Sequence, residues 1–302
     1  MKILLLGKNG QIGRELRHAL PALGEVVSLG REDIDLRDQD ALRITLSSHQ
    51  PDVIVNAAGY TAVDLAESHQ NEAALLNTQA VTTLAHYAQD SGTLLVHYST
   101  DYVFDGASTA AYTEADAPAP KNVYGATKLA GEAAIRAALC DALILRCSWV
   151  YAADGQNFPR TILRLARTRD QLDVVVDQVG APTSAALIAD VTLRAITARQ
   201  RSLLASGIYH LSASGVTSWY AYARYLVAGA AARRIPLRLT PDGIRPITSA
   251  DYNAAARRPH NSRLDSTLLA TALGLQLADW THGVEQILDQ LSERAHHGGD
   301  LP

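Results

Sequence analysis

The segment Lys2-Ile-Leu-Leu-Leu-Gly7-Lys-Asn-Gly10-Gln-Ile-Gly13 joins a short apolar run to three glycines in the spacing GxxGxxG. The apolar run predicts a buried β-strand, and the glycines come just before a helical segment. Glycines at such a turn let the backbone approach a pyrophosphate closely, while the N-terminus of the next helix faces the anion. The segment therefore predicts a dinucleotide site. A plain turn is the alternative, and the spacing differs from the commoner GxGxxG.

Strand and helix patterns alternate after this segment through the first half of the chain. Apolar runs that predict strands lie at 2–6, 25–29, 53–58, 94–98 and 142–148, and helical periodicity lies between them at 12–20, 41–47, 75–88 and 123–139. This alternation is typical of right-handed βαβ units. We therefore predict an α/β fold with a Rossmann-type doubly wound parallel sheet, which a β-rich run at 172–177 extends.

The pattern becomes less regular after residue 149. Helical stretches at 158–168, 186–197, 219–232 and 283–294 mix with short strands such as 208–211, and prolines interrupt the loops. These features predict a smaller mixed α/β domain. We expect residues 1–148 and 171–200 to form the dinucleotide-binding domain, and 149–170 and 201–302 to form mainly the substrate domain, with a frayed tail from residue 296.

The composition is that of a globular protein without a nucleic-acid or membrane surface. Of its 302 residues 47% are hydrophobic and 19% are charged, and the net charge of −4 comes without long runs of one sign. The apolar run at 2–6 is too short for a signal sequence or a membrane-spanning helix. Cys140 and Cys147 form no CxxC motif, so we expect buried free thiols and a cytoplasmic protein.

Residues suited to ligand binding follow five of the predicted strands. They are Gly7, Arg31, Gly59, Thr100 and Trp149. Because open parallel sheets bind ligands at the carboxyl ends of their strands, we expect these positions to meet in one crevice. Small residues around Gly59 permit close approach by a cofactor, and Thr100 and Asp101 offer hydrogen bonds to a substrate. Each segment alone is a weak signal, because such residues often simply form turns.

The position after the second strand bears on the choice of cofactor. NAD-dependent dehydrogenases usually place an acid here, which accepts a hydrogen bond from the ribose 2′-hydroxyl. In this chain Arg31 comes first, and Glu32 and Asp33 follow it. An arginine can pair with a 2′-phosphate, so we expect NADPH with NADH possible; a solvated surface arginine is the alternative. Asp35 and Leu36 lie where a carboxylate can accept from the adenine amino group.

Tyr124 and Lys128 stand four residues apart in a predicted helix. Residues at i and i+4 share one helix face, so a lysine ammonium there can lower the pKa of the neighbouring phenol. The phenol then becomes a better proton donor or acceptor near neutral pH. Both residues are common on helix surfaces, so the pair gains its weight from the strand-end residues around it.

Seven phrases follow one another along the chain. After Gly7-Lys-Asn-Gly-Gln-Ile-Gly13 they are Asn56-Ala-Ala-Gly-Tyr-Thr-Ala-Val-Asp64, His97-Tyr-Ser-Thr-Asp-Tyr-Val-Phe-Asp-Gly106, Asn122-Val-Tyr-Gly-Ala-Thr-Lys128, Arg146-Cys-Ser-Trp-Val-Tyr151, Asp177-Gln-Val-Gly-Ala-Pro-Thr183 and Arg258-Pro-His-Asn-Ser-Arg-Leu264. In this order they resemble the dTDP-4-dehydrorhamnose reductase family of the extended short-chain dehydrogenase/reductase superfamily. The resemblance covers most of the chain.

The resemblance implies reduction of the C4 keto group of dTDP-4-dehydro-L-rhamnose by NADPH or NADH, the last step of dTDP-L-rhamnose synthesis for surface polysaccharide. Tyr124 would protonate the developing alkoxide, and Lys128 would support the phenol and hold the nicotinamide ribose. Thr100 would orient the sugar O4. Asp101 and Trp149 would contact the deoxysugar, although Trp149 could equally be a buried packing residue. Arg257 or Arg258 would pair with the diphosphate.

Motifs and resemblance together assign a larger set of residues to the cofactor. These are Gly7, Asn9, Gly10, Gln11, Ile12, Gly13, Arg31, Asp35, Leu36, Ala58, Gly59, Tyr60, Tyr98, Tyr124 and Lys128.

One property of some relatives transfers poorly. These reductases form dimers around a magnesium ion held by glutamates, and Glu15 matches one ligand position. The other two positions hold Ala186 and Gln290, which supply no carboxylate. Because Mg²⁺ prefers several charged oxygens, we expect no such metal site here, and a homodimer would need other contacts.

Two other functions fit parts of the pattern. A sugar-nucleotide 4,6-dehydratase or epimerase shares the fold, but dehydratases usually follow the threonine with two acids, whereas Tyr102 follows Asp101 here. A non-catalytic regulatory subunit, like the methionine adenosyltransferase β subunit, could keep the cofactor fold without turnover. The presence of Thr100, Tyr124 and Lys128 together favours an enzyme.

Overall fold

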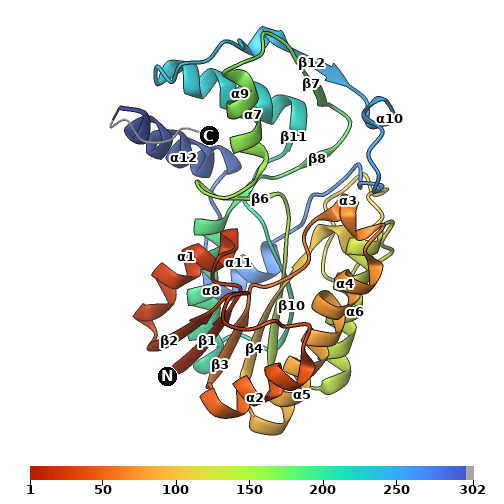
Figure 1. Cartoon of the computed structure of the whole chain (residues 1–302), viewed down its shortest axis with the longest axis vertical. Helices are drawn as coiled ribbons and strands as arrows, with labels where there is room; N and C mark the ends of the chain where they lie inside the picture. The colour runs from red at the N-terminus through yellow and green to blue at the C-terminus, as the bar shows by residue number, and fades with distance from the viewer. Residues whose placement is uncertain (297–302) are drawn as a thin grey trace.

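A six-stranded parallel sheet forms the centre of the computed structural model, which describes residues 1–296 (Figure 1). Its strands are β1 (Lys2–Leu6), β2 (Glu25–Leu29), β3 (Val53–Asn56), β4 (Leu94–Thr100), β5 (Ala142–Cys147) and β10 (Gly207–Leu211), in the spatial order β10-β5-β4-β3-β1-β2. All neighbouring strands are parallel. The order reverses at β1, which is where such sheets bind nucleotides. The predicted fold class is confirmed.

Side chains of the strands alternate between two hydrophobic cores. In β1, Ile3 and Leu5 belong to one core, whereas Leu4 and Leu6 belong to the other. The helices α1 (Gln11–Ala19), α8 (Ala185–Gln200) and α11 (Thr267–Leu273) cover the first face. The helices α2 (Gln39–His49), α5 (Ala80–Ser91) and α6 (Val123–Ala138) cover the second. Burial on both faces explains why the strands read as continuous apolar runs. We call the sheet and these helices the sheet lobe.

Short helical elements lie in the connections between the strands and the main helices of the sheet lobe. They are the 3₁₀ turns η1 (Leu20–Ala22) and η3 (Asp101–Val103), the helices α3 (Val63–Ala66) and α4 (Gln70–Ala74), and the π-helical turn η2 (Leu75–Gln79) that leads into α5. Within η2, the Asn77 side chain accepts a hydrogen bond from the Tyr60 N–H at 2.8 Å and donates one to Thr127 Oγ1 at 3.1 Å. The π turn thus ties the loop after β3 to α6.

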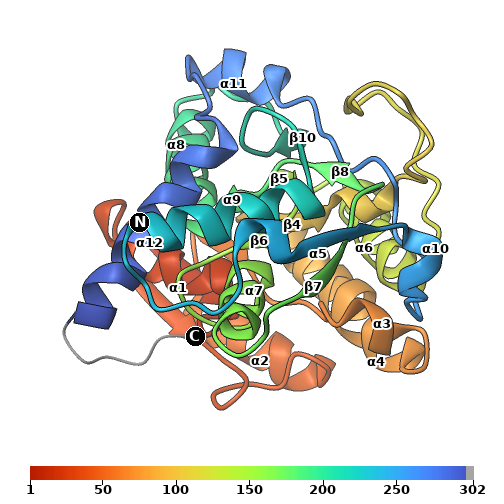
Figure 2. The same cartoon turned by 90° about the horizontal axis from the view of Figure 1, so that it is seen from above.

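A second lobe packs above the carboxyl edge of the sheet (Figures 1 and 2). It contains β6 (Val150–Tyr151), α7 (Phe158–Ala166), β7 (Leu172–Val175), β8 (Val179–Gly180), β9 (Thr183–Ser184), β11 (Thr217–Ser218), α9 (Trp219–Ala232), η4 (Pro241–Gly243), β12 (Ile244–Ile247), α10 (Ser249–Tyr252) and α12 (Trp280–His296). Its strands form three two-stranded sheets, and Leu163, Leu226 and Leu288 share a separate core there.

Two strand assignments from the sequence are wrong. The run at 172–177 does not extend the central sheet, because β7 pairs with β12 in the second lobe. Conversely, the strand expected at 208–211 in the substrate domain is β10, which pairs with β5 at the edge of the central sheet. Apolar runs of this length report burial, but they do not say which sheet buries them.

The tail that the sequence predicts from residue 296 begins later than expected. His296 still belongs to helix α12, and the rest of the predicted tail lies outside the described residues. Across residues 1–296, no helix combines the length and the apolar character that crossing a bilayer requires.

Candidate functional site

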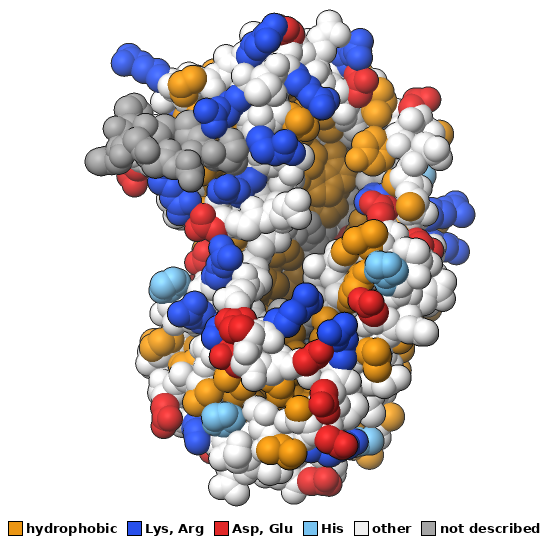
Figure 3. Space-filling model, in the orientation of Figure 1, with side chains coloured by type: hydrophobic (Ala, Val, Ile, Leu, Met, Phe, Trp, Pro, Cys, Tyr) orange, Lys and Arg blue, Asp and Glu red, His pale blue; other side chains and the backbone are white. Residues whose placement is uncertain are grey.

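A cavity of about 780 Å³ lies between the two lobes at the carboxyl edge of the sheet. It is visible in Figure 3 as a hollow with a hydrophobic floor. Residues that follow β1, β2, β3, β4 and β5 line it, and Trp219 adds a wall from α9. The expected convergence of strand ends on one crevice is therefore confirmed.

The glycine segment forms one wall of the cavity and needs its glycines for close packing. Gly7 has a φ of +86°, and a Cβ there would lie 2.6 Å from the Ala58 nitrogen. A Cβ on Gly13 would lie 2.0 Å from the Gly7 oxygen. Gly10 caps α1 without any side-chain hydrogen bond to the first turn, so the N–H groups of that turn are left to face the cavity. Such a cradle fits the pyrophosphate of a dinucleotide.

The two acids that follow β2 already form ion pairs with a lysine. Lys8 forms ion pairs with Asp33 at 2.5 Å and with Glu32 at 3.1 Å. Asp33 also accepts a hydrogen bond from the Gly30 N–H at 2.8 Å. Hydrogen bonds from Gly30 and Lys8 lower the pKa of Asp33. Arg31 lines the cavity beside them. Of these four charged residues, Arg31 is the one that lines the cavity.

Asp35 and Leu36 both line the cavity at the end expected for adenine. The Asp35 carboxylate, however, is held by Arg37, whose NH2 nitrogen lies 2.7 Å from Oδ2. This ion pair lowers the pKa of Asp35. Arg37 also lines the cavity, and the sequence analysis missed it. Arg37 directly follows the Asp35-Leu36 segment that the sequence analysis assigned to the adenine, so a search one residue further along the chain would have found it.

Thr100 and Asp101 stand at the end of β4, and both are almost completely buried. Thr100 Oγ1 accepts from the Tyr102 N–H at 3.1 Å and donates to Asp101 Oδ1 at 3.1 Å. The other carboxylate oxygen of Asp101 has no hydrogen-bond partner. Burial raises the pKa of Asp101 to about 6, although the Ser262 and Thr100 hydroxyls act in the opposite direction. Asp101 is therefore a buried carboxyl group beside Thr100, and it also lines the cavity.

Asp101→Asn should increase the free energy of unfolding at about pH 8 by about 1–3 kcal/mol. The folded-state pKa lies above the unfolded value of 3.8, so folding takes up a proton between these two values and stability falls as pH rises across them. The gain should therefore shrink towards pH ~4, as urea unfolding at several pH values would show. Asp105→Asn is the control, because hydrogen bonds from Ala107 and Tyr112 lower the pKa of Asp105. An equal gain in both variants would refute the burial argument.

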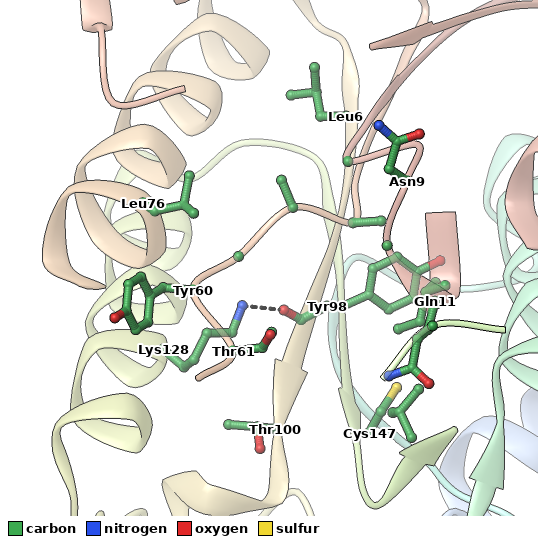
Figure 4. A pocket seen from close by; sticks show the side chains of 18 of the residues that line it. Leu6, Asn9, Gln11, Tyr60, Thr61, Leu76, Tyr98, Thr100, Lys128 and Cys147 are labelled. Carbon is green, nitrogen blue, oxygen red and sulfur yellow. Dashed lines mark hydrogen bonds between the residues drawn. The ribbon is translucent and has the colours of Figure 1, made fainter. Parts of the chain in front are cut away.

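Tyr124 and Lys128 lie on α6 with their side chains directed at the cavity. Asn122 caps the helix by accepting from the Gly125 N–H at 2.8 Å. A Cβ on Gly125 would lie 2.1 Å from the Tyr102 oxygen, so only glycine lets α6 approach this close to η3. The Lys128 amine donates to the Tyr98 carbonyl at 2.5 Å and lies 3.2 Å from His97 Nε2. Figure 4 shows the hydrogen bond from this amine to the Tyr98 carbonyl, with Thr100 and Tyr60 on the same side of the pocket.

The pKa values of Tyr124 and Lys128 differ from those that their spacing on the helix predicts. Burial raises the pKa of Tyr124, so the expected lowering by Lys128 is wrong for the site without ligands. Burial also lowers the pKa of Lys128 to about 8. The reason is that both groups are withdrawn from water, whereas the sequence spacing reports only that they share a helix face. Tyr124 is consequently a protonated phenol at neutral pH.

Trp149 forms the aromatic wall of the cavity together with Trp219. The two rings stack with centroids 3.5 Å apart and an interplanar angle of 11°. Trp149 has a φ of +48°, and a Cβ on Gly180 would lie 2.7 Å from its ring. Trp149 is not a fully buried packing residue, because it also lines the cavity. Trp219 was missed, since nothing in the sequence pairs the start of α9 with Trp149.

The structure brings nearly all of the expected site residues together. Those that line the cavity are Gly7, Asn9, Gly10, Gln11, Ile12, Arg31, Asp35, Leu36, Ala58, Gly59, Tyr60, Tyr98, Thr100, Asp101, Tyr124, Lys128 and Trp149. Gly13 is the exception, because it packs beneath Gly7 instead. Tyr98 contributes its backbone, since its hydroxyl is bonded to Thr192 on the far side of the strand.

The two arginines expected at a diphosphate are placed elsewhere. Neither Arg257 nor Arg258 is among the residues that line the cavity, and Arg258 is paired with Asp64 at 2.6 Å. The pairing of either arginine with a diphosphate has no support in this arrangement. Arg258 instead fastens the segment before α11 to α3.

The positions that hold magnesium in some relatives lie on three helices, with Glu15 on α1, Ala186 on α8 and Gln290 on α12. Among residues 1–296, no group of three histidine, cysteine, aspartate or glutamate side chains is arranged to hold a metal ion. The three positions thus supply a single carboxylate, that of Glu15.

Comparisons with known proteins agree with this geometry. The family described as "RmlD substrate binding domain" matches residues 1–293. A dTDP-4-dehydrorhamnose reductase of Escherichia coli strain K12 is 45% identical over 295 residues, which are 96% of this chain and 98% of that protein. A crystal structure of a dTDP-4-dehydrorhamnose reductase from Clostridium acetobutylicum superposes with a TM-score of 0.89 at 34% identity, covering 96% and 99% of the two chains. The corresponding enzyme from Bacillus anthracis, in complex with NADP, gives a TM-score of 0.87 at 31% identity with the same coverage.

Proposed function

The chain belongs to the RmlD substrate binding domain family, and we propose that it is a dTDP-4-dehydrorhamnose reductase. It would reduce the C4 keto group of dTDP-4-dehydro-L-rhamnose to give dTDP-L-rhamnose for surface polysaccharide. The observation that carries the proposal is the single cavity that joins the glycine cradle to Thr100, Tyr124 and Lys128. A nucleotide cradle alone would suit many enzymes, but an acid positioned beside it suits reduction of a ketone.

The cofactor is NADPH, with NADH as a possible substitute, and its nicotinamide would supply the hydride. The Gly7–Gly13 segment and the first turn of α1 would hold the pyrophosphate. Because Lys8 occupies Glu32 and Asp33, these acids are not free to accept from a ribose 2′-hydroxyl. Arg31 is available for a 2′-phosphate, which supports NADPH. Lys128 would donate to the nicotinamide ribose.

Proton transfer falls to Tyr124. A tyrosine phenol is already protonated at neutral pH, and this one stays so because burial raises its pKa. It can therefore give a proton to the alkoxide that would form at C4. Thr100 would direct its hydroxyl to the sugar O4. In the site without substrate this hydroxyl donates to Asp101, so substrate binding would redirect one hydrogen bond.

The sugar would lie between the sheet and the tryptophan stack. A 6-deoxy sugar has an apolar methyl group and apolar C–H faces, which suit the rings of Trp149 and Trp219. Asp101 lines the cavity at the end of β4, where it would accept from a sugar hydroxyl. A dehydratase would need a second acid after Asp101, and this position holds Tyr102.

The proposal also covers the roles of the two lobes, the cellular compartment and the oligomeric state. The sheet lobe would bind the cofactor, and the second lobe would bind most of the sugar nucleotide. The protein would act in the cytoplasm, in keeping with two buried cysteines that form no disulfide. A homodimer of this chain would form without a shared magnesium ion.

The decisive experiment is an assay with enzymatically generated dTDP-4-dehydro-L-rhamnose. We expect oxidation of NADPH with formation of dTDP-L-rhamnose, identified by NMR, and a lower kcat/KM with NADH. Arg31→Ser should weaken NADPH selectively, because it removes the partner of the 2′-phosphate and leaves the rest of the cradle intact. Absence of turnover with both cofactors would favour a regulatory subunit, and loss of water from the sugar would favour a dehydratase. Equal losses with both cofactors in Arg31→Ser would remove this arginine from the phosphate.

A further inference from the structure

The N-terminus of α6, the helix that carries Tyr124, is held by two groups from outside the helix. The Val123 N–H donates to Glu67 Oε1 at 2.8 Å, and the Asn122 side chain donates to the Arg257 carbonyl at 2.8 Å. Glu67 directly follows α3, whereas Arg257 lies in the segment between α10 and α11. Both contacts are made within two residues of Tyr124, so they fix the turn of the helix from which its phenol extends.

A further set of contacts closes this arrangement. Residues 256–258, which we call the strap, are fastened to α3 by Asp64. Asp64 Oδ1 accepts from the Ala256 N–H at 2.9 Å, and the Asp64 carboxylate pairs with Arg258 at 2.6 Å. Because Glu67 stands at the end of the same short helix, α3, the strap and the start of α6 are joined in a closed triangle.

The Asn122 side chain is the joint between the strap and the helix. Its Oδ1 caps α6 by accepting from the Gly125 N–H at 2.8 Å, and its Nδ2 faces the Arg257 carbonyl. A backbone N–H only donates and a backbone carbonyl only accepts, so the amide fits in one orientation alone. Asn122 is only 8% exposed, which shields both hydrogen bonds from water. The start of α6 therefore follows the position of the strap.

We propose that the strap and Asn122 position Tyr124 for proton transfer, and that the Asp64–Arg258 ion pair is the clamp that holds the strap in place. The side chains of Asn122, Asp64 and Arg258 do not line the cavity, so they act through the tyrosine and not on a ligand. A displacement of the reacting groups by about 1 Å can slow a reaction strongly, so a loose first turn of α6 costs rate. The donor role of Tyr124 itself rests on the proposed function.

The same stretch of chain continues from the strap to the tryptophan wall. The Val179 N–H donates to the His260 carbonyl, and the Ser262 N–H donates to the Val179 carbonyl, each at 2.8 Å. The next residue, Gly180, packs against Trp149, because a Cβ there would lie 2.7 Å from its ring. One segment thus sets the spacing between the proton donor and the ring that the sugar would contact.

The first test measures the clamp without cofactor or turnover. Hydrogen exchange of single backbone amides, followed by NMR, reports how often each hydrogen bond opens. In Arg258→Met the Val123 amide should exchange at least about tenfold faster, because the strap no longer holds the start of α6. Amides in the last two turns of α6 should be unchanged. Arg258→Lys keeps a cation beside Asp64, so it should give a smaller increase.

Arg263→Met is the matched control for this measurement. Arg263 lies on the same segment and is half-buried like Arg258, but its side chain donates to Asn261 and to the Thr109 carbonyl rather than to α3. The Val123 amide should therefore exchange as in the parent. Equal acceleration in Arg263→Met and Arg258→Met would overturn the proposal.

Asp64→Asn is a second variant that opens the clamp. It keeps an oxygen for the Ala256 N–H and removes the charge that holds Arg258, so it should accelerate the same amide of α6. No acceleration in either clamp variant, or a uniform acceleration along the whole of α6, would show that the strap does not hold the start of the helix.

The second test asks whether the clamp acts through Tyr124. Arg258→Met should lower kcat by about tenfold and leave the KM for NADPH within about two-fold, and Arg258→Lys should restore most of the rate. In a Tyr124→Phe background, Arg258→Met should have little further effect in single-turnover measurements, because the donor that it positions is gone. Equal fold-losses in both backgrounds would contradict the link to Tyr124. An absence of turnover in the parent would count against the proposed function, and the exchange rates would still decide whether the clamp holds α6.

Discussion

Tyr124→Phe should lower kcat for NADPH-dependent reduction by about 10²–10⁴-fold, because it removes the positioned proton donor. The aromatic ring remains, so the KM values for sugar and cofactor should change little. Because the variant lacks only the hydroxyl that donates the proton, the reaction should lose rate in the chemical step and not in binding. Steady-state kinetics of parent and variant, with single-turnover measurements of hydride transfer, would separate these steps.

Tyr102→Phe is the matched control for this loss. Tyr102 is also a partly buried phenol on the cavity wall, and its ring meets that of Tyr124 edge to face with centroids 5.6 Å apart. Removing its hydroxyl should leave kcat within a few-fold of the parent. A comparable collapse in both variants would mean that the cavity tolerates no loss of a hydroxyl, and Tyr124 would lose its special role.

Arg146→Met should lower the free energy of unfolding by about 3–5 kcal/mol, because it leaves a buried carboxylate without its counter-ion. The Arg146 and Glu132 side chains are only 2% and 1% exposed, and they pair at 2.6 Å. Glu132 also accepts from the Ser99 hydroxyl at 2.5 Å, and the Arg146 guanidinium lies 5.1 Å from the centre of the Phe104 ring. Urea unfolding at neutral pH would measure the loss.

The double variant Arg146→Met/Glu132→Gln should recover part of this stability, since it removes the uncompensated charge and not the packing. Arg43→Met is the exposed control, because Arg43 pairs with Asp40 on the surface of α2 and such pairs contribute little. If Arg146→Met were as mild as Arg43→Met, the pair would not be a structural element that joins α6 to the sheet.

The sequence was informative wherever burial alone sets the structure. β1, β2 and α9 begin and end at the predicted residues, because both faces of those strands, or one regular face of the helix, are apolar. It was not informative where partners come from distant segments. The pairing of β7 with β12 joins residues about 70 positions apart, as the Leu172–Ile244 register shows, and no local pattern indicates it.

The same limit applies to the site. Thr100, Tyr124 and Lys128 could be found because strand ends and helix spacing place them. The ion pairs of Lys8 and the hydrogen bonds of His97 could not, because they depend on which side chains meet behind the cavity wall. For the same reason the sequence suggested a lowered pKa for Tyr124, whereas burial, a property of the whole fold, raises it.

The path of the chain through the two lobes has a consequence for its synthesis. The core of the second lobe contains Tyr151 from β6 and also Leu291 from α12, near the end of the described residues. Between them the chain returns to the sheet lobe to supply α8 and β10. On the ribosome, therefore, most of the central sheet emerges early, while the apolar faces of α7 and α9 remain uncovered until α12 has been translated. The second lobe is thus the part of the nascent protein whose apolar surface waits longest for its cover, and such exposed surface promotes aggregation.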